Sequence, residues 1–437
     1  MRKLFLSGFS LLMILSLVLA GCGGGNGKNE SNAQQVESGN NGTEAESEPA
    51  KKVKLSILSW NNEKEMKPVL DGFTKKYPNI TFDFSNAPPV KDYIAKLQSM
   101  LLSDSATDIF IIAAENRNEI IDGGYALDLT DQPFMDTMIE ANKPMLSKDG
   151  RTYAFTQTGW AGGLFYNKQL FEQAGIASVP RTWDEFIAAS LKLKEAGIIP
   201  LYDNMQDVTT IHSGLFANLT LSQDPEFDRK LFEGETTFAE GWTETFRIWK
   251  RDLIDNGILK PDMIGLTGDQ IVNEFALGNV AMFPGGPWNI NTLEETNPDL
   301  EFGMMAVPGV NAAGGNYFAG APGVGFAVNS KTKFKEEALL FLEYLASPEG
   351  LKAFEEGTGS TITAKGYESQ VHPALEEAYR NGLLANKIYL PMVAWPRNQE
   401  ALRGQFVVSI QDLAVGKVTP EQVTEALDKK LKEMENK

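Results

Sequence analysis

Side chains that carry nucleophilic or metal chemistry are scarce in this chain of 437 residues. It has two histidines, His212 and His372, and a single cysteine, Cys22. A zinc site or a Cys–His pair therefore lacks ligands, and no G-x-S-x-G or G-x-x-x-x-G-K-[ST] pattern presents a nucleophilic serine or a phosphate-binding loop. These absences predict a protein with no catalytic residue, no metal and no cofactor.

Carboxylates are the one abundant reactive group, with 58 Asp and Glu residues. Composition therefore leaves open an alternative, a surface carbohydrate-active enzyme that places two carboxylates on one glycosidic bond. No such pair stands in a distinctive motif, so we expect a binding protein and not an enzyme. The net charge of −18, without a clustered basic stretch, also excludes nucleic acid as a partner.

Tryptophans carry the functional prediction. Three of them, Trp183, Trp242 and Trp249, have helical surroundings typical of packing. The other four are expected at strand ends or in loops, where α/β folds bind ligands: Trp60, Trp160, Trp288 and Trp395. A pyranose has an apolar face that stacks on a flat ring, and its hydroxyls need fixed polar partners. These four tryptophans therefore favour a carbohydrate ligand.

The elements that must position these residues alternate between strands and helices. Residues 53–60 alternate like a strand, 65–77 fit a helix with an apolar face, and 80–84 fit a second strand. A helix over 93–102 and an apolar strand over 108–113 follow. This alternation predicts βαβ units and an α/β fold with mostly parallel sheets flanked by helices.

Capping motifs mark the starts of three later helices. Thr182 with Glu185 three residues on is a capping box, and Gly197 is expected to end that helix. Ser347 and Thr419 each precede a proline, which suits the first helical position. The sequence thus predicts helices throughout its C-terminal half.

The N-terminus has the pattern of a secretion signal. Arg2 and Lys3 precede an apolar, uncharged run from Leu4 to Ala20. The LAGC stretch that ends at Cys22 resembles the bacterial lipoprotein processing box, in which the cysteine is lipidated. We therefore expect a signal peptide over 1–21 and a lipid on Cys22.

Residues 23–52 are polar, with Val36 as their only large apolar residue. Such a segment cannot bury enough surface to offset the entropy of ordering it. We expect the segment 22–52 to be a lipidated, flexible tether that holds a folded body at the extracytoplasmic face of the cell membrane.

Four stretches of the folded body resemble one known family. They are Phe165–Gly175 continuing to Phe186, FALGNVAMFPGGPW over 275–288, Gly325–Asn329 followed by the helix that ends at Gly350, and the helix from Thr419 to Leu427. In this order, and behind a lipoprotein signal, they resemble the extracellular solute-binding proteins of carbohydrate ABC importers, the group that includes maltose-binding protein. The resemblance covers nearly all of residues 53–437.

The resemblance implies a periplasmic-binding-protein fold, with two α/β lobes joined by hinge strands and a ligand cleft between them. We place the N-terminal lobe at 53–157 plus 323–362 and the C-terminal lobe at 158–322 plus 363–437, with crossings near 155–162, 317–323 and 357–365. The implied function is capture of a carbohydrate, expected to be an oligosaccharide, by closure of the lobes and delivery to the permease subunits of an ABC importer. We expect a monomer.

The resemblance also implies binding residues. Trp288 matches a tryptophan of the family that stacks on sugar, Trp395 matches a late aromatic with a similar role, and Trp160 stands where maltose-binding protein has a carboxylate. Polar ligand groups are expected from both lobes, and Trp60 would lie beside them. These groups are Asn62, Glu63, Glu115, Asn116, Arg117, Asp203, Asp207 and Arg397.

Each of these polar residues has an alternative role as a helix cap or a solvated loop group. Two alternative functions also stay open besides the enzyme: a solute-binding protein for a non-sugar ligand, and a lipoprotein without a transport role, such as an adhesin or a sensor partner. An arginine in the cleft would favour an acidic sugar, or it would support a neighbouring carboxylate.

Overall fold

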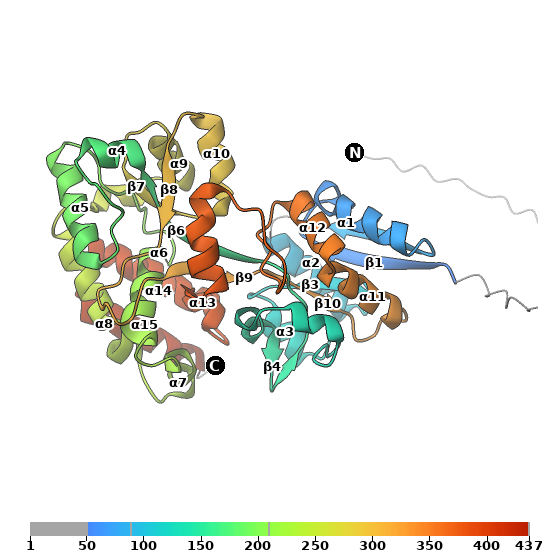
Figure 1. The fold of residues 1–437 in the computed structure, drawn as a ribbon. Coiled ribbons are helices and arrows are strands. Elements are labelled where there is room, and N and C mark those ends of the chain that lie inside the picture. Colours follow the sequence, from blue (N-terminus) through green and yellow to red (C-terminus); the bar gives the residue numbers. More distant parts are fainter. Residues whose placement is uncertain (1–50, 88–89, 209, 436–437) are drawn as a thin grey trace, which may run out of the picture. The chain divides into compact units, whose positions relative to one another are not determined.

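The computed structural model describes residues 51–87, 90–208 and 210–435. The expected signal peptide, Cys22 and all of the expected tether except Lys51 and Lys52 lie outside the described residues. From Lys51 onward the chain contains two sheets of four or five strands, and each sheet has its own helices and core (Figure 1). We name these parts lobe 1 and lobe 2.

Lobe 1 has a four-stranded sheet in the order β10-β3-β1-β2. Strand β1 pairs in parallel with β2 and β3, and β10 adds to β3 in the antiparallel direction. The first half of the lobe consists of β1 (Val53–Ser59), α1 (Glu63–Lys76), β2 (Ile80–Asn86), α2 (Val90–Leu102), β3 (Ile109–Ile112), α3 (Arg117–Asp122), the 3-10 helices η1 (Pro133–Thr137), η2 (Glu140–Asn142) and η3 (Pro144–Leu146), and the hairpin of β4 (Ser147–Lys148) and β5 (Arg151–Thr152). The second half consists of β10 (Gly325–Val328), α11 (Lys335–Ala346) and α12 (Pro348–Thr358).

The predicted strands and helices of lobe 1 are confirmed because their apolar faces meet in one core. Helix α1 buries Met66, Val69, Leu70 and Phe73, and it packs on α12. The Phe73 ring lies edge-on to Phe341 of α11 at 5.4 Å between ring centroids. Since α11 comes from more than 250 residues further along the chain, the core of lobe 1 joins two distant stretches of sequence.

Lobe 2 has a five-stranded sheet in which β6 is central. Its elements begin with β6 (Gly159–Asn167), α4 (Lys168–Gln173), α5 (Trp183–Glu195), α6 (Thr210–Phe216), η4 (Ala217–Leu221), α7 (Phe227–Glu233), α8 (Phe238–Trp249), η5 (Lys250–Ile254), η6 (Pro261–Gly265), α9 (Gly268–Ala276), β7 (Met282–Gly285), η7 (Pro287–Asn289), α10 (Ile290–Thr296), β8 (Phe302–Met305) and β9 (Phe318–Pro322). They end with η8 (Pro373–Leu375), η9 (Ala378–Leu384), β11 (Ile388–Tyr389), α13 (Pro391–Ala394), α14 (Gln399–Ala414) and α15 (Pro420–Glu435).

The expectation of a mostly parallel sheet is wrong for lobe 2. Strand β6 pairs with β7, β8 and β9 in the antiparallel direction, and only β11 and β9 pair in parallel. The reason is the route of the chain, because β6 carries it out of lobe 1 and β9 carries it back. The two faces of this sheet pack on separate clusters, one with α5, α6, α8, α14 and α15 and the other with α9, α10 and η9.

Three segments pass between the lobes side by side. Gly323 N donates to Thr158 O at 2.8 Å, and Thr363 N donates to Gln157 O at 2.8 Å. A side chain at Gly323 would place its Cβ 1.8 Å from Thr158 Oγ1, so only glycine allows this close approach. Short hydrogen-bonded strands of this kind are the usual hinges of two-lobe proteins.

The predicted caps are confirmed in detail. Both bonds of the Thr182–Glu185 capping box are present, and α5 ends just before Gly197, which has a φ of 75°. Ser347 Oγ accepts from Gly350 N at the start of α12, and Thr419 Oγ1 accepts from Gln422 N at the start of α15. Local polar chemistry therefore sets these helix starts independently of the tertiary contacts.

Candidate ligand-binding site

Two of the predicted tryptophans, Trp160 and Trp288, meet at the end of the lobe 2 sheet that faces the hinge. Trp160 is the second residue of β6, and Trp288 lies in η7 just after β7. Their ring centroids are 5.3 Å apart at an interplanar angle of 70°. Trp288 keeps 62% of its surface exposed, whereas Trp160 is partly buried. An exposed indole held by a second one offers a flat apolar face to a ligand.

Glycines make this aromatic pair possible. A Cβ at Gly286 would lie 2.3 Å from the Trp288 ring, and one at Gly162 would lie 2.7 Å from Gly285 O and 3.6 Å from the Trp160 ring. The chain can therefore bring both rings against the backbone only because these positions lack side chains.

The third tryptophan, Trp60, comes from lobe 1 and is partly buried. Its ring lies edge-on to Tyr93 at 6.0 Å. The Tyr93 hydroxyl accepts from Ile111 N at 2.6 Å and donates to Ile111 O at 2.9 Å, so it ties α2 to the end of β3. Trp60 therefore has a fixed support next to the turn that follows β3.

That turn carries three predicted residues with different environments. Glu115 is exposed, Asn116 is buried and its Oδ1 accepts from Ala113 N at 2.8 Å, and Arg117 is 8% exposed. The Arg117 guanidinium crosses to lobe 2, where it donates to Val393 O at 2.8 Å and to Trp395 O at 2.5 Å. Burial lowers the pKa of Arg117. The guanidinium thus bonds main-chain carbonyls of the other lobe, and its predicted role in ligand binding stays a prediction.

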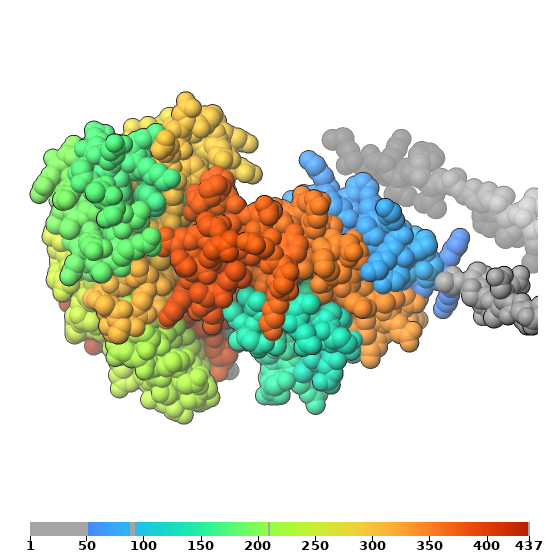
Figure 2. Space-filling model, in the orientation of Figure 1, coloured from blue at the N-terminus to red at the C-terminus, as the bar shows by residue number. Residues whose placement is uncertain are grey.

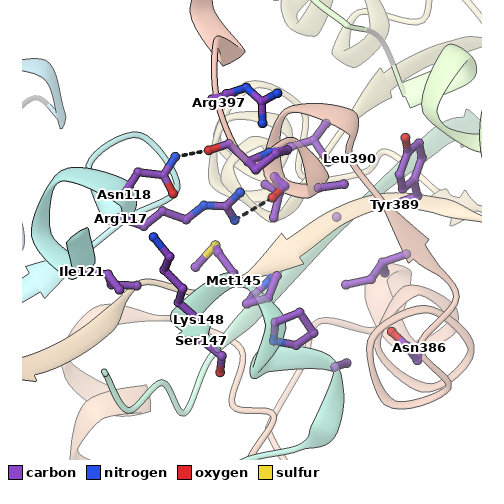
Figure 3. Close-up of a pocket in the computed structure, with 18 of the residues that line it drawn as sticks. Arg117, Asn118, Ile121, Met145, Ser147, Lys148, Asn386, Tyr389, Leu390 and Arg397 are labelled. Atoms are coloured by element: carbon purple, nitrogen blue, oxygen red, sulfur yellow. Dashed lines mark hydrogen bonds between the residues drawn. The ribbon is translucent and has the colours of Figure 1, made fainter. Parts of the chain in front are cut away.

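A cavity of about 600 Å³ lies between the lobes beside this bridge (Figure 3). Lobe 1 lines it with α3 and the stretch from η2 to β4, and lobe 2 lines it with β9 and residues 386–397. Figure 3 shows Arg117 and Asn118 reaching toward the main chain between β11 and α14, with Lys148 beside them. Figure 2 shows the surface hollowed between the teal segment around β4 and the yellow-green segment around α7.

A smaller cavity of about 250 Å³ shares two lining residues, Leu390 and Val393, with the larger one. Here Glu115 of lobe 1 lies opposite Asp207 and Arg403 of lobe 2. Arg403 forms an ion pair with Asp207 at 3.4 Å and with Glu400 at 3.1 Å. The two predicted acidic residues are thus brought together from different lobes, around a cation that sequence reasoning missed.

Other predicted residues have structural roles. Asn62 caps α1 by accepting from Glu65 N, while Glu63 in the first turn is exposed. Asp203 is 2% exposed, and its Oδ1 accepts from Met205 N at 2.9 Å. Arg397 lines the larger cavity, but its guanidinium bonds Phe232 O and Glu435. Asn116 and Asp203 are buried as well, whereas Asn62 is exposed, and the role of these three residues in ligand binding stays a prediction.

Trp395 is fully buried and so offers no face to the cleft. Its ring packs among Phe232, Phe238 and Trp242 at 6.0–6.3 Å between centroids. Its neighbours in the sequence gave it the appearance of a loop residue, yet the aromatic residues of α7 and α8 surround it.

Sequence reasoning also missed Asn118, Lys148 and Tyr389, which line the larger cavity. Asn118 and Lys148 belong to no recognisable sequence motif. The direction of the Asn118 side chain depends on its position in α3, and that of Lys148 depends on the two-residue strand β4. Tyr389 is the second and last residue of β11, and the pairing of β11 with β9 brings it to the hinge.

Tyr389 donates to both carboxylate oxygens of Asp228 at 3.1 Å. Burial raises the pKa of Asp228 to about 7 from its ordinary value of 3.8, although the hydrogen bond from Tyr389 opposes the shift. The neutral carboxyl therefore supports the folded state fully below pH 3.8, and this support is lost as the pH rises through about 7.

We expect Asp228→Asn to flatten the fall in stability between pH 4 and 8 and to make the protein more stable than the wild type at pH 8. Urea unfolding at several pH values measures this effect. Asp131→Asn, a change at an exposed carboxylate, is the control and should leave the pH dependence unchanged. Parallel curves for Asp228→Asn and the wild type would contradict the raised pKa.

The two histidines lie in different surroundings, and His372 pairs with Glu294 at 3.2 Å. His212 is fully buried between aromatic rings, and this burial lowers its pKa to about 3, so it is neutral. No group of three or more potential metal ligands occurs in the described ranges. Within those ranges, no helix has the length and apolarity needed to span a bilayer.

Comparisons with known proteins agree with this geometry. The sequence profile of the family described as "Bacterial extracellular solute-binding protein" matches residues 59–352. The chain is 23% identical over 342 residues to the multiple sugar-binding protein of Streptococcus mutans serotype c, covering 75% of this chain and 79% of that protein. It is 21% identical over 392 residues to the melibiose/raffinose/stachyose-binding protein of Bacillus subtilis, covering 87% and 88%.

The fold has a similar counterpart among solved structures. A family 1 extracellular solute-binding protein from Bifidobacterium longum subsp. infantis superposes with a TM-score of 0.80 and is 30% identical. The match covers 88% of this chain and 100% of that one. The two-lobe arrangement and the sequence therefore indicate the same relationship.

Proposed function

The chain belongs to the bacterial extracellular solute-binding protein family, and on this basis we propose that it captures an oligosaccharide between its lobes and delivers it to an ABC importer. Family membership places the protein outside the cytoplasm and makes solute binding its activity. The sugar, the way it is held and the membrane attachment are the parts that we propose.

The observation that carries the sugar assignment is the pair formed by Trp160 and the 62%-exposed Trp288. A large indole that keeps most of its surface exposed leaves a flat apolar face open, and a hexose ring covers such a face well. The relatives whose names specify sugars, among them melibiose, raffinose and stachyose, support the same class of ligand.

We assign binding roles to the predicted residues whose rings or carboxylates are at least partly exposed. Trp160 and Trp288 stack on the sugar from lobe 2, and Trp60 does so from lobe 1. Glu63, Glu115 and Asp207 have exposed carboxylates suited to accept hydrogen bonds from hydroxyls. The lobes comprise 53–157 plus 323–362 and 158–322 plus 363–437, and the protein acts as a monomer whose closed form the permease recognises.

A ligand screen tests this function. The purified protein would be heated with mono- to tetrasaccharides, including melibiose, raffinose and stachyose, and with amino acids and peptides. A ligand that binds only the folded state stabilises it and so raises the melting temperature. At a free ligand concentration of 100 times Kd, the stabilisation is about 2.7 kcal/mol. A rise with one class of sugar is expected, whereas a rise with peptides alone would overturn the sugar assignment.

We propose binding without hydrolysis. A carboxylate pair across one glycosidic bond is what an enzyme would need. In the described cavities, Glu115 and Asp207 come from separate lobes, and Asp207 is held by Arg403. Overnight incubation with the sugar found in the screen should release no new reducing ends.

Cys22 is the proposed site of lipid attachment, because it ends the LAGC stretch and is the only cysteine of the chain. We expect Cys22→Ser to move the protein from the membrane fraction to the medium in a Gram-positive host, while its affinity for sugar stays unchanged. Fractionation and metabolic labelling with palmitate measure this. Continued membrane retention of Cys22→Ser would contradict a lipid anchor.

A further inference from the structure

The turn that carries Trp288 is anchored to the core of lobe 2 at both ends. Before the turn, β7 ends at Gly285, which pairs with Gly163 of β6. After the turn, α10 begins with Ile290, which is 7% exposed. Between them, Pro287 is the first residue of η7, and its ring fixes its own φ. Trp288 therefore lies in a short segment with fixed ends.

Asn289 closes this turn by bonding two main-chain atoms of one residue. Its Oδ1 accepts from Gly286 N at 3.0 Å, and its own N donates to Gly286 O at 3.0 Å. We name these two bonds the Asn289 clamp. Gly286 is buried, so its N–H depends on the carboxamide for a partner. A Cβ at Gly285 would lie 2.5 Å from Asn289 Oδ1, so glycine at that position gives the carboxamide its place.

The clamped residue lies directly against the indole of Trp288. A Cβ at Gly286 would lie 2.3–2.7 Å from three atoms of the ring, Cη2, Cζ3 and Cζ2. The six-membered ring therefore rests against Gly286, and the ring of Trp160 lies 5.3 Å away. Because 62% of the Trp288 surface is exposed, the orientation of its ring depends strongly on these two supports.

We propose that Asn289 is a positioning residue for sugar binding, which holds Gly286 and, through it, the Trp288 ring in the orientation that stacks on the sugar. A ring that is ordered before binding loses less conformational entropy when the sugar covers it. Asn289 itself does not contact the sugar and acts only through Trp288. This inference rests on the proposed capture of an oligosaccharide.

Asn289→Ala tests the clamp. It removes the acceptor for Gly286 N and keeps the main-chain bond to Gly286 O, and Asn289 is partly exposed, so the variant should fold. The probe is the mono- to tetrasaccharide with the largest effect in the ligand screen, which includes melibiose, raffinose and stachyose. We expect its Kd for the full chain, measured by isothermal titration, to rise on the order of tenfold. Asn289→Asp keeps the acceptor oxygen and should restore an affinity close to that of the wild type.

A double-mutant cycle with Trp288→Ala separates positioning from other roles. If Asn289 acts only through the ring, Asn289→Ala should cause no further loss of affinity in a protein that already carries Trp288→Ala. A residue that bonds the sugar itself would weaken binding by the same factor in both backgrounds. Such additivity would overturn the proposal.

Gly286→Ala displaces the same ring without touching Asn289. The φ of Gly286 is −149°, which alanine adopts without strain, whereas the new methyl group would push the Trp288 ring away. Two indoles as close as those of Trp160 and Trp288 give a coupled signal in far-ultraviolet circular dichroism, and the difference between the wild type and Trp288→Ala isolates it. Asn289→Ala and Gly286→Ala should both diminish this signal. Its full retention in Asn289→Ala would show that the ring needs no clamp and would overturn the proposal.

Asn297→Ala is the matched control. Asn297 follows the other end of α10, is partly buried like Asn289, and also bonds the main chain, because its Nδ2 donates to Ala276 O at 2.9 Å. Its replacement should change neither the Kd nor the coupled signal. A wild type that binds the sugar and an Asn289→Ala variant that binds it equally well would overturn the clamp alone. A wild type that binds none of the screened sugars would overturn the proposed function instead.

Discussion

Trp288→Ala is expected to weaken the binding of the oligosaccharide by about 2 kcal/mol, or roughly 30-fold in Kd. The indole is 62% exposed and touches Trp160, so a sugar ring that covers it gains apolar contact that alanine cannot supply. Because the side chain is mostly in solvent, the free energy of unfolding should change by less than about 0.5 kcal/mol. Titration calorimetry and urea unfolding of the same preparation measure the two quantities.

Leu277→Ala is the control for this result. Leu277 lies just after α9 in the same lobe and is 63% exposed, so it matches Trp288 in exposure. Its replacement should change neither affinity nor stability. If Trp288→Ala binds the sugar as tightly as the wild type, the stacking role of the pair is excluded, and the ligand must be held elsewhere in the cleft.

Trp395→Ala is expected to have the opposite profile, with a loss of about 3–5 kcal/mol in the free energy of unfolding. The side chain is fully buried among Phe232, Phe238 and Trp242, and its removal leaves a cavity that rigid aromatic neighbours cannot fill. Its carbonyl, which Arg117 contacts, remains in the variant. The affinity for sugar at a temperature where the variant is folded should therefore fall by only a few-fold.

Trp395→Phe makes this test more specific. Phenylalanine keeps most of the apolar contact, so it should recover more than half of the lost stability. A Trp395→Ala protein with normal stability and no sugar binding would show that the indole leaves the core and stacks on the ligand, as the family resemblance implied.

Local patterns determined much of lobe 1. The alternation in 53–60 predicted β1, and the apolar spacing in 65–77 predicted α1, because period and burial follow directly from backbone geometry. The capping box at Thr182 acts over three residues, so neighbouring residues suffice to place the start of α5, whereas α1 begins at Glu63, two residues before the predicted start. Trp288 was also identified from its neighbours, since a turn of glycine and proline leaves a tryptophan at the surface.

Features that depend on distant partners were beyond the reach of the sequence. The antiparallel pairing of β6 with β9 joins residues about 160 positions apart, and its direction follows from the route of the chain between lobes. Trp395 looks like a loop residue until α7 and α8 enclose it. Arg117 bonds carbonyls 276 and 278 residues away, and carbonyls carry no side-chain signal that a sequence could reveal.

By itself, therefore, the sequence determined the α/β class of the fold, because short-range periodicity and capping encode it, and its resemblance to the solute-binding family predicted a carbohydrate ligand and Trp288 as a binding residue. Only the tertiary structure decided which candidates are free to bind. Asn116 and Asp203 are buried and accept hydrogen bonds from the backbone, the Trp395 ring packs in the core, and the Arg117 guanidinium bonds carbonyls of lobe 2. The physical reason is that a polar or aromatic side chain can bind a ligand only if folding leaves it without a stronger partner.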